Sequence, residues 1–312
     1  MNPLFIKELK SYFANLNTDF VYFPIYGSTV FTHLLEAIPS KVKKIIGDHS
    51  GRRYKIYDNL LRENKTVSFD ELLKLTTDYH LLNNIEKVDA IHVINPLVKP
   101  IYNQVTNTLV LDIPNIVNMK TDKEDFLWSD RTKTIIAVGS LIKLKNFNTL
   151  IKVFKKIEKE FSDWKLEIYG EGSEKSALEK LIKELSLDKK VFLKGFTSNI
   201  QKEFKKSMVH ASVSNAESFG LTMVEAMSQG TITLSTNTTI GAKYLIENEK
   251  TGFLADSNSE ADIIVKLKYI LKLIEEDNHL ISEVQQKAYL KSQQFNNVNI
   301  SDKWDKALSL LS

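Results

Sequence analysis

The sequence contains no cysteine, and this absence excludes structural disulfides, thiolate metal sites and a cysteine nucleophile. Arginine is also scarce, with only four residues against 38 lysines. The last arginine in the chain is Arg131. An anion bound by the second half of the chain must therefore be met by lysine side chains and backbone N–H groups.

Long apolar runs and tracts of one charge are missing as well. The most apolar early stretch, residues 20–38, is interrupted by Pro24, Gly27, His33 and Glu36, whereas a membrane-spanning helix needs about 20 mostly apolar residues. Lys7, Glu8 and Lys10 stand where a secretory signal would be apolar. The net charge is only +3 and is spread evenly, so there is no basic tract for nucleic acid. We therefore expect a cytoplasmic protein that neither spans a membrane nor binds nucleic acid.

The composition can fill a core, because 43% of the 312 residues are apolar and 26% are charged. Short β-rich runs alternate with helical periodicity almost from end to end, which is the pattern of α/β units around a parallel sheet. The alternation is regular in residues 134–295 and predicts a complete Rossmann-like domain there. Its strands are expected at residues 134–138, 165–169, 191–193, 209–213, 231–234 and 252–254, and its main helices at 146–161, 219–229, 261–276 and 280–293.

The first block, residues 1–118, is less complete. It offers four good strands, whereas a doubly wound domain needs five or six. They are expected at residues 20–23, 42–46, 90–94 and 108–111, with helices at about 4–15, 28–37 and 70–78. Residues 119–133 are polar and have no clear period, so they predict a linker between two domains.

The sharpest local signal is a pair of glutamates around a predicted helix start. Ser218 is a candidate N-cap, and the helix is expected to begin at Phe219 and to end at Gly230. Glu217 precedes this helix, and Glu225 lies about 10 Å further along its axis. The helix N-terminus between them offers free N–H groups and a positive dipole end, which suit a phosphate. Taken alone, the pair is explained more simply as a solvated loop residue and a surface helix residue.

Other motifs surround this pair in a fixed order. The strand at 134–138 leads into Gly139, Lys145 and a helix start, and YGEGS (169–173), VFLKGF (191–196) and TGFL (251–254) follow. With the glutamate pair, this series resembles the donor-binding domain of retaining nucleotide-sugar glycosyltransferases of family 4, over about residues 134–278. The resemblance implies an α/β fold with two Rossmann-like domains facing a cleft, the GT-B architecture, and a donor site on the second domain.

The resemblance also implies roles for individual residues. Glu225 matches the glutamate that binds the ribose hydroxyls, and Glu217 matches the one that contacts the transferred sugar. The backbone of Phe219, Gly220 and Leu221 would hold the diphosphate and sugar hydroxyls.

Three other turns of the family have counterparts here. Lys145 matches the lysine that neutralises the diphosphate, which stabilises charge on the leaving group. Gly195 and Phe196 match the turn whose backbone reads the base. Gly170 and Gly172 match the turn that lets the ligand approach, and Gly139 is a further candidate for binding the donor.

One position departs from the family pattern. The family has Gly-Arg-Leu where this sequence has Gly139, Ser140 and Leu141. Serine cannot replace the charge or the bidentate contacts of an arginine. Either Lys143 compensates from the same loop, or this domain is weakened or inactive.

The first block resembles only the later part of the family's first domain. The strand before His49 matches one that in some members ends in a histidine that contacts the donor sugar; a core or surface histidine is the alternative. Ile113, Pro114 and Asn115 match the segment that closes this domain. We therefore predict a shortened first domain, with the helix of residues 296–312 packing back on it as in the family.

The resemblance implies a retaining glycosyltransferase that moves a sugar from a UDP- or GDP-type nucleotide sugar to an acceptor hydroxyl. Its catalytic residues would be Glu217, Lys145 and His49. The nucleotide sugar is the substrate, and no tightly bound cofactor and no metal are expected. The acceptor would be a glycan, a wall polymer or a lipid-linked molecule in bacterial surface glycan synthesis, with contact at the inner face of the membrane as an option.

Another class of function stays open. The shortened first domain and Ser140 also fit a non-catalytic nucleotide-sugar-binding subunit, or a fragment that needs a partner chain. A sugar phosphorylase or epimerase on the same scaffold is a lesser alternative, because scaffold alone does not fix the reaction.

Overall fold

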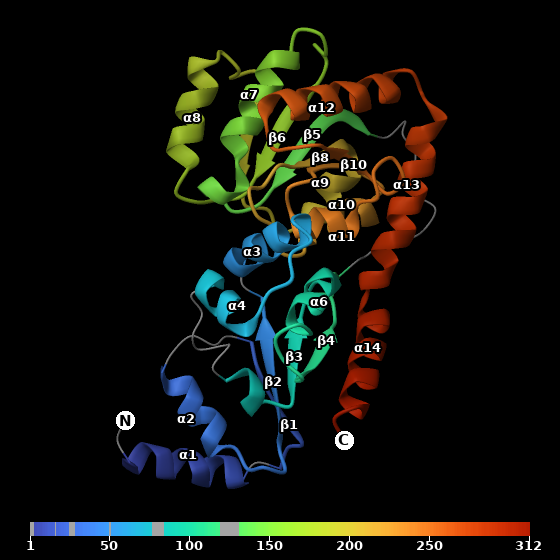
Figure 1. The fold of residues 1–312 in the computed structure, drawn as a ribbon. Coiled ribbons are helices and arrows are strands. Elements are labelled where there is room, and N and C mark those ends of the chain that lie inside the picture. Colours follow the sequence, from blue (N-terminus) through green and yellow to red (C-terminus); the bar gives the residue numbers. More distant parts are fainter. Residues whose placement is uncertain (1–2, 16, 25–28, 50, 77–83, 119–130) are drawn as a thin grey trace. The chain divides into compact units, whose positions relative to one another are not determined.

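The computed structural model describes residues 3–15, 17–24, 29–49, 51–76, 84–118 and 131–312, and within them the chain is α/β with two parallel sheets (Figure 1). The chain divides into two compact units. Unit 1 comprises Met1–Pro114 with Ser301–Ser312, and unit 2 comprises Asn115–Ile300. Most of the predicted linker lies outside the described residues, and its end already belongs to a strand that begins at Thr132.

Unit 1 holds a sheet of four parallel strands in the order β1-β2-β3-β4. The strands are β1 (Phe20–Phe23), β2 (Lys43–Asp48), β3 (Ala90–Val93) and β4 (Leu109–Asp112). The helices are α1 (Pro3–Asn15), α2 (Thr29–Ala37), α3 (Gly51–Arg62), α4 (Phe69–Thr76), α6 (Lys99–Tyr102) and α14 (Asn297–Ser309), with 3-10 turns η1 (Ile85–Lys87) and η2 (Pro96–Val98).

The helix α3 was not among the elements expected from the sequence. Tyr54 and Tyr57 are buried on this helix beside Asp58 and Leu60, and the two tyrosines lie over a buried carboxylate. The Tyr57 hydroxyl donates to Asp48 Oδ2 at 2.9 Å, and the Tyr102 hydroxyl of α6 donates to the same oxygen at 2.7 Å. A buried carboxylate needs such donors, so α3 is held by a polar contact that apolar periodicity does not reveal.

The other face of this sheet carries α14. The Trp304 ring packs against the Tyr22 ring of β1 and the His92 ring of β3, with centroids 5.8 and 4.8 Å away. From Ser301 onward, the C-terminal helix therefore packs on the sheet of unit 1.

Unit 2 holds a sheet of six parallel strands in the order β10-β9-β8-β5-β6-β7. The strands are β5 (Thr132–Val138), β6 (Lys165–Tyr169), β7 (Val191–Gly195), β8 (Ser207–Ser212), β9 (Ile232–Thr236) and β10 (Phe253–Ala255). The helices are α7 (Phe147–Ile157), α8 (Lys175–Glu184), α9 (Ile200–Lys206), α10 (Leu221–Ser228), α11 (Ile240–Leu245), α12 (Glu260–Glu275) and α13 (His279–Ser292), with 3-10 turns η4 (Lys143–Lys145) and η5 (Gln293–Phe295).

Helices cover both faces of this sheet (Figure 1). Alternate residues of β5 point to opposite faces. Ile135 enters a core that contains residues of α7, α8 and α12, whereas Ile136 packs with Phe204 of α9 and Ala226 of α10. The predicted α/β class is confirmed, and this doubly wound arrangement brings the carboxyl ends of the strands to one edge, where such sheets bind ligands.

Candidate functional site

The ends of β5, β6 and β7 in unit 2 are joined through backbone hydrogen bonds. The Gly139 N–H donates to Tyr169 O at 3.0 Å, and the Gly170 N–H donates to Gly195 O at 2.8 Å. A Cβ atom on Gly170 would lie 1.9 Å from Gly139 O, and its φ is +141°. Only glycine allows this approach, so the three turns form one continuous edge.

Lys145, at the end of η4, reaches across to the loop before α10. Its Nζ donates to Glu217 Oε2 at 2.7 Å, and the two side chains are 23% and 17% exposed. The loops are also joined through the backbone, because the Asn215 N–H donates to Leu144 O at 2.8 Å. The Gly241 N–H of α11 donates to Glu217 O at 2.9 Å. Both charged residues are therefore held at the edge of the sheet.

The helix α10 begins later than the sequence analysis expected. Gly220, not Ser218, is its N-cap, with a left-handed φ of +97°, and the helix starts at Leu221. The ring of Phe219 is buried against those of Tyr244 and Phe295. This anchoring needs a turn before the helix, and glycine makes that turn without strain.

The first turn of α10 leaves backbone donors available. The N–H groups of Gly220, Leu221 and Thr222 have no hydrogen-bond partner among the described residues. The next amide, that of Met223, already donates to Gly220 O at 3.0 Å. This helix start has the donors and the dipole that an anion requires.

Glu225 lies on the same helix and is half-buried. Burial raises the pKa of its carboxyl group above the usual value. Within the described part of the chain, no hydrogen bond or ion pair engages this carboxylate. It is therefore available as an acceptor for hydroxyl groups.

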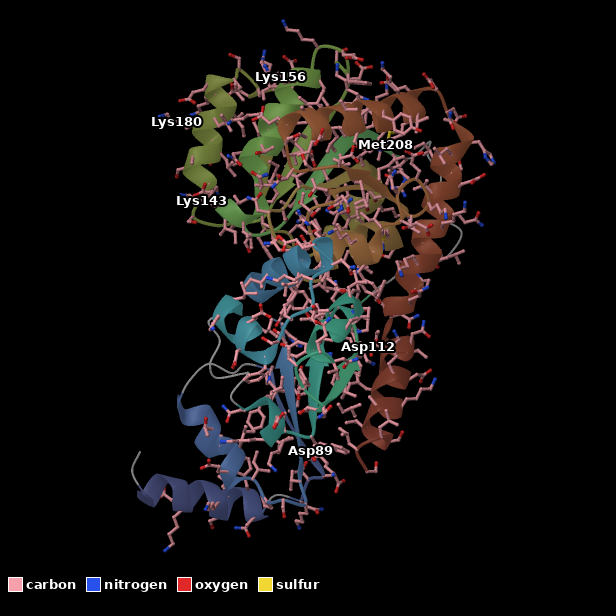
Figure 2. The ribbon with its side chains drawn as sticks, viewed as in Figure 1. Asp89, Asp112, Lys143, Lys156, Lys180 and Met208 are labelled. Carbon is pink, nitrogen blue, oxygen red and sulfur yellow. The ribbon has the colours of Figure 1, made fainter. Side chains whose placement is uncertain are left out.

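The remaining predicted positions line the turns nearby. Ser140 is exposed and uncharged, and Lys143, on the loop that leads into α7, is exposed without an ion pair to any described residue (Figure 2). Phe196 follows β7 and is 81% exposed. An aromatic ring so open to solvent is free to stack on a planar ligand.

One buried residue was not singled out from the sequence. His210, in the middle of β8, is fully buried, and neither of its ring nitrogens has a hydrogen-bond partner within the part of the chain that the structure describes. Burial, together with the charge of Lys145, lowers the pKa of His210 to about 3. A lone histidine in a buried strand carries no local pattern, so only the packing identifies it.

His49 belongs to unit 1 and follows β2 directly. Its Nε2 lies 3.1 Å from the hydroxyl of Tyr22 and 3.2 Å from Nδ1 of His92. Partial burial lowers the pKa of His49, so the ring is neutral at physiological pH. Of this group, only His49 was expected from the sequence, because its partners come from strands far apart along the chain.

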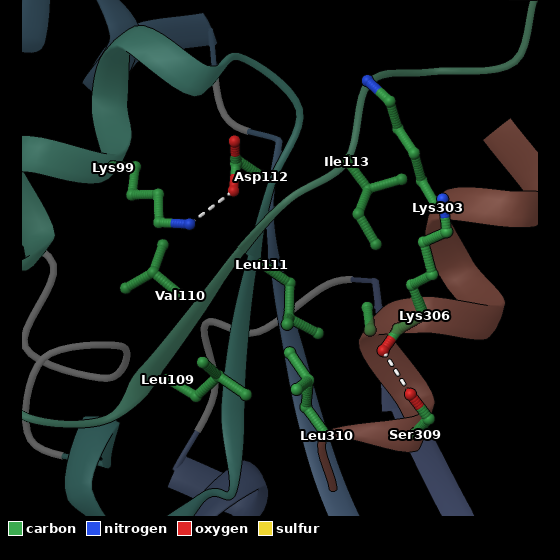
Figure 3. A pocket seen from close by; sticks show the side chains of 11 residues that line it. Lys99, Leu109, Val110, Leu111, Asp112, Ile113, Lys303, Lys306, Ser309 and Leu310 are labelled. Atoms are coloured by element: carbon green, nitrogen blue, oxygen red, sulfur yellow. Dashed lines mark hydrogen bonds and ion pairs between the residues drawn. The ribbon is translucent and has the colours of Figure 1, made fainter. Parts of the chain in front are cut away.

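Unit 1 also contains a hollow of about 570 Å³ between β4 and α14 (Figure 3). Its lining is mainly apolar, and Lys99 at its rim already pairs with Asp112 at 2.6 Å. None of the predicted donor-binding residues lines it. It is therefore separate from the site around Lys145 and Glu217.

Two features are absent from the described residues. These residues hold no cluster of three or more His, Asp or Glu side chains placed to bind a metal ion. They also include no helix with the length and apolarity needed to cross a membrane.

Several known proteins are similar to this chain in sequence or in fold. Residues 118–287 match the family model described as "Glycosyl transferases group 1". A Campylobacter jejuni 4-alpha-N-acetylgalactosaminyltransferase that acts on a diphospho-undecaprenol glycan is 33% identical over 57% of this chain and 46% of its own length. A Staphylococcus aureus poly(ribitol-phosphate) alpha-N-acetylglucosaminyltransferase is 28% identical over 64% of this chain and 40% of its own.

A solved structure extends the likeness over nearly the whole chain. The pneumococcal O-GlcNAc transferase GtfA, in complex with UDP and GlcNAc, matches 98% of this chain and 59% of its own, with a TM-score of 0.77 and 22% identity. This likeness shows the fold, which is that of the GT-B glycosyltransferases. The chain spans less than half the length of the two curated relatives above. Since the family model covers more than half of its residues, the chain belongs to the glycosyl transferases group 1 family.

Proposed function

We propose that this chain is a retaining glycosyltransferase that moves a sugar from a nucleotide-sugar donor to an acceptor hydroxyl. One observation carries the proposal. Glu217, paired with Lys145, precedes a helix whose first amides have no hydrogen-bond partner among the described residues, and the half-buried Glu225 follows on that helix. This arrangement fits a diphosphate with a sugar at each end.

The donor is proposed to bind along the start of α10. Its diphosphate would accept hydrogen bonds from the amides of Gly220 to Thr222 and take its countercharge from Lys145. Glu225 would accept hydrogen bonds from the ribose hydroxyls. Glu217 would orient the transferred sugar. The turn at Gly195 and Phe196 would meet the base.

The proposed reaction needs no protein nucleophile. The bond between the anomeric carbon and the diphosphate oxygen breaks, and the acceptor oxygen bonds to the same face of that carbon. The acceptor proton passes to the departing diphosphate, so atoms and charge balance. Lys145 and the helix amides stabilise the negative charge that builds on the leaving group, which is the largest catalytic term available to such a site.

The relatives favour a particular donor within this class. Two are named as N-acetylhexosaminyltransferases, and the solved neighbour holds UDP and GlcNAc. We therefore propose a UDP-N-acetylhexosamine as the donor, with a GDP-sugar as the alternative. The acceptor would be a bacterial wall polymer or a lipid-linked glycan, which would place the reaction at the inner face of the membrane.

Incubation of the purified chain with UDP-GlcNAc, UDP-GalNAc or GDP-mannose and a panel of polyol-phosphate and lipid-linked acceptors tests this proposal. We expect acceptor-dependent release of UDP, and an α-anomeric product by NMR from an α-linked donor. Glu217→Ala should lower turnover at least 100-fold, whereas Glu179→Ala, an exposed change on α8, should not. An inverted product would contradict the retaining mechanism, and full activity of the Glu217 variant would contradict the site.

A second candidate function has its own support. Ser140 is uncharged, and Lys145 is already neutralised by Glu217. Such a site also suits a subunit that binds a nucleotide sugar without turning it over, or a chain that needs a partner for activity. Binding would raise the melting temperature in both cases by mass action. Thermal stabilisation by UDP without any UDP release from UDP-GlcNAc would favour this second function.

A further inference from the structure

Three polar aromatic side chains of unit 1 form a closed hydrogen-bonded cluster at the end of β2. The Tyr22 hydroxyl lies 2.7 Å from Nδ1 of His92 and 3.1 Å from Nε2 of His49, and the two histidine nitrogens are 3.2 Å apart. The three residues come from β1, β3 and the loop after β2. The Trp304 ring of α14 packs on His92 and Tyr22 and completes the cluster.

The hydrogen positions in this cluster follow from the contact of His92 with a backbone carbonyl group. Nε2 of His92 lies 2.6 Å from the carbonyl oxygen of Ile113, which can only accept, so this nitrogen carries the proton. Burial lowers the pKa of His92 to about 4, so the ring is neutral at physiological pH. Its Nδ1 is then an acceptor, and the Tyr22 hydroxyl donates to it.

The same logic extends to His49. The only hydrogen of the Tyr22 hydroxyl is already donated to His92 Nδ1, so the Tyr22 oxygen accepts at its other contact. His92 Nδ1, the second neighbour of His49 Nε2, is also an acceptor. Both contacts of His49 Nε2 are therefore satisfied only when this nitrogen is protonated. In the neutral ring, Nδ1 of His49 is left with a lone pair, and no described residue donates to it.

We propose that Tyr22 and His92 are positioning residues that hold the neutral His49 ring with Nε2 protonated and Nδ1 as a hydrogen-bond acceptor. In a ring held in this way, Nδ1 can accept a hydrogen bond from a hydroxyl group. Under the proposed function, on which this identification rests, the hydroxyl group belongs to a substrate. His49 as a whole is exposed at the end of β2.

Gly47 leaves the space that this cluster needs. A Cβ atom at this position would lie 2.3 Å from the Tyr22 hydroxyl oxygen and 3.1 Å from His49 Nε2. Contacts below 3.0 Å do not persist, so an alanine here would displace the tyrosine hydroxyl. Gly47→Ala therefore breaks the cluster while all three polar residues remain.

Nitrogen-15 NMR of the histidine rings tests the assignment without any substrate. We expect a protonated Nε2 and an unprotonated Nδ1 in both His49 and His92 at pH 7.5. In Tyr22→Phe and Gly47→Ala the second tautomer of His49 should become detectable. Tyr12→Phe, an exposed tyrosine of α1, is the matched control. A protonated Nδ1 in His49 of the unchanged chain, or no change in either variant, would overturn the proposal.

Kinetics provide a second measurement. Tyr22→Phe should lower kcat/KM about tenfold, which corresponds to the upper end of the net free energy of one neutral hydrogen bond. The melting curve should be unchanged. His49→Asn keeps an acceptor near the Nδ1 position and His49→Gln does not, so Asn should retain more activity. Equal losses in the two variants would contradict the role of Nδ1. Absence of transfer by the unchanged chain would contradict the proposed function instead, while the spectra still decide the tautomer.

Discussion

Lys145 Nζ and Glu217 Oε2 are 2.7 Å apart and join the loop after β5 to the loop before α10. In this arrangement the lysine charge is already neutralised. A diphosphate that binds at the start of α10 must therefore share Lys145 with Glu217 or replace it. Under the proposed function, the Glu217 carboxylate therefore competes with the diphosphate for the Lys145 ammonium group.

Lys145→Ala should lower turnover about 100-fold, because it removes a cation that stabilises charge on the departing diphosphate. UDP affinity should fall as well. Steady-state kinetics and calorimetric titration with UDP measure the two effects. Lys156→Ala, an exposed lysine of α7 (Figure 2), is the matched control and should leave both unchanged. A Lys145 variant with normal turnover would remove this residue from the mechanism.

Glu225→Gln should weaken UDP binding about 10- to 100-fold, the value of hydrogen bonds to an ionised carboxylate. The control is Glu179→Gln on the exposed face of α8. Titration with UDP at pH 7.5 measures the change, and equal affinity in the two variants would exclude Glu225 from nucleotide binding.

The same substitution should not lower stability at neutral pH. Because the folded-state pKa of Glu225 is raised, the folded chain binds this proton more tightly than the unfolded chain. Stability is therefore lost as the pH rises above about 4.5 through the folded pKa, and glutamine avoids this cost. Denaturant unfolding at pH 7.5 and pH 4 should show an advantage of the variant only at pH 7.5.

Ser140→Arg should tighten UDP binding about 3- to 10-fold, because an arginine fork adds charge and bidentate contacts at a position that is now exposed and neutral. The gain should shrink at high salt, since an exposed charge is screened. Ser140→Gln is the control for size without charge. A gain of the same size in both variants would argue against an electrostatic cause.

His210→Phe should alter the acid stability of unit 2. The pKa of the buried ring is about 3 in the folded state against 6.5 when unfolded, so only the unfolded chain binds the proton between these values. Its contribution to stability is full above pH 6.5 and falls by up to about 1.4 kcal/mol per pH unit as the pH drops. The phenylalanine variant should lack this contribution to the pH dependence of the free energy of unfolding.

Urea unfolding at several pH values between 7.5 and 4.5 gives the slope of the unfolding free energy against pH for the unchanged chain and for His210→Phe, and the two slopes are compared. His279→Gln, an exposed change at the start of α13, should keep it. Identical slopes for the unchanged chain and the His210 variant would show that the ring is protonated within the folded unit.

The sequence by itself determined the α/β class and most strands of unit 2. Alternation between short β-rich runs and helical periods is local, and glycines such as Gly170 stand where strands end. It also placed Lys145 and Glu217 just before helices and Glu225 within one, because each of these local motifs spans only a few residues. Only the tertiary structure decided that Lys145 and Glu217, 72 residues apart, form an ion pair.

Other features depended on contacts between distant strands. The start of α10 shifts to Leu221 because Phe219 is anchored by Tyr244 and Phe295, which no local pattern indicates. The cluster around His49 joins β1, β2 and β3, and its hydrogen positions follow from a backbone carbonyl 64 residues from His49. Periodicity and composition indicate which secondary structure a segment can form. Charge pairing, burial and hydrogen-bond direction depend on which segments meet, and packing alone decides that.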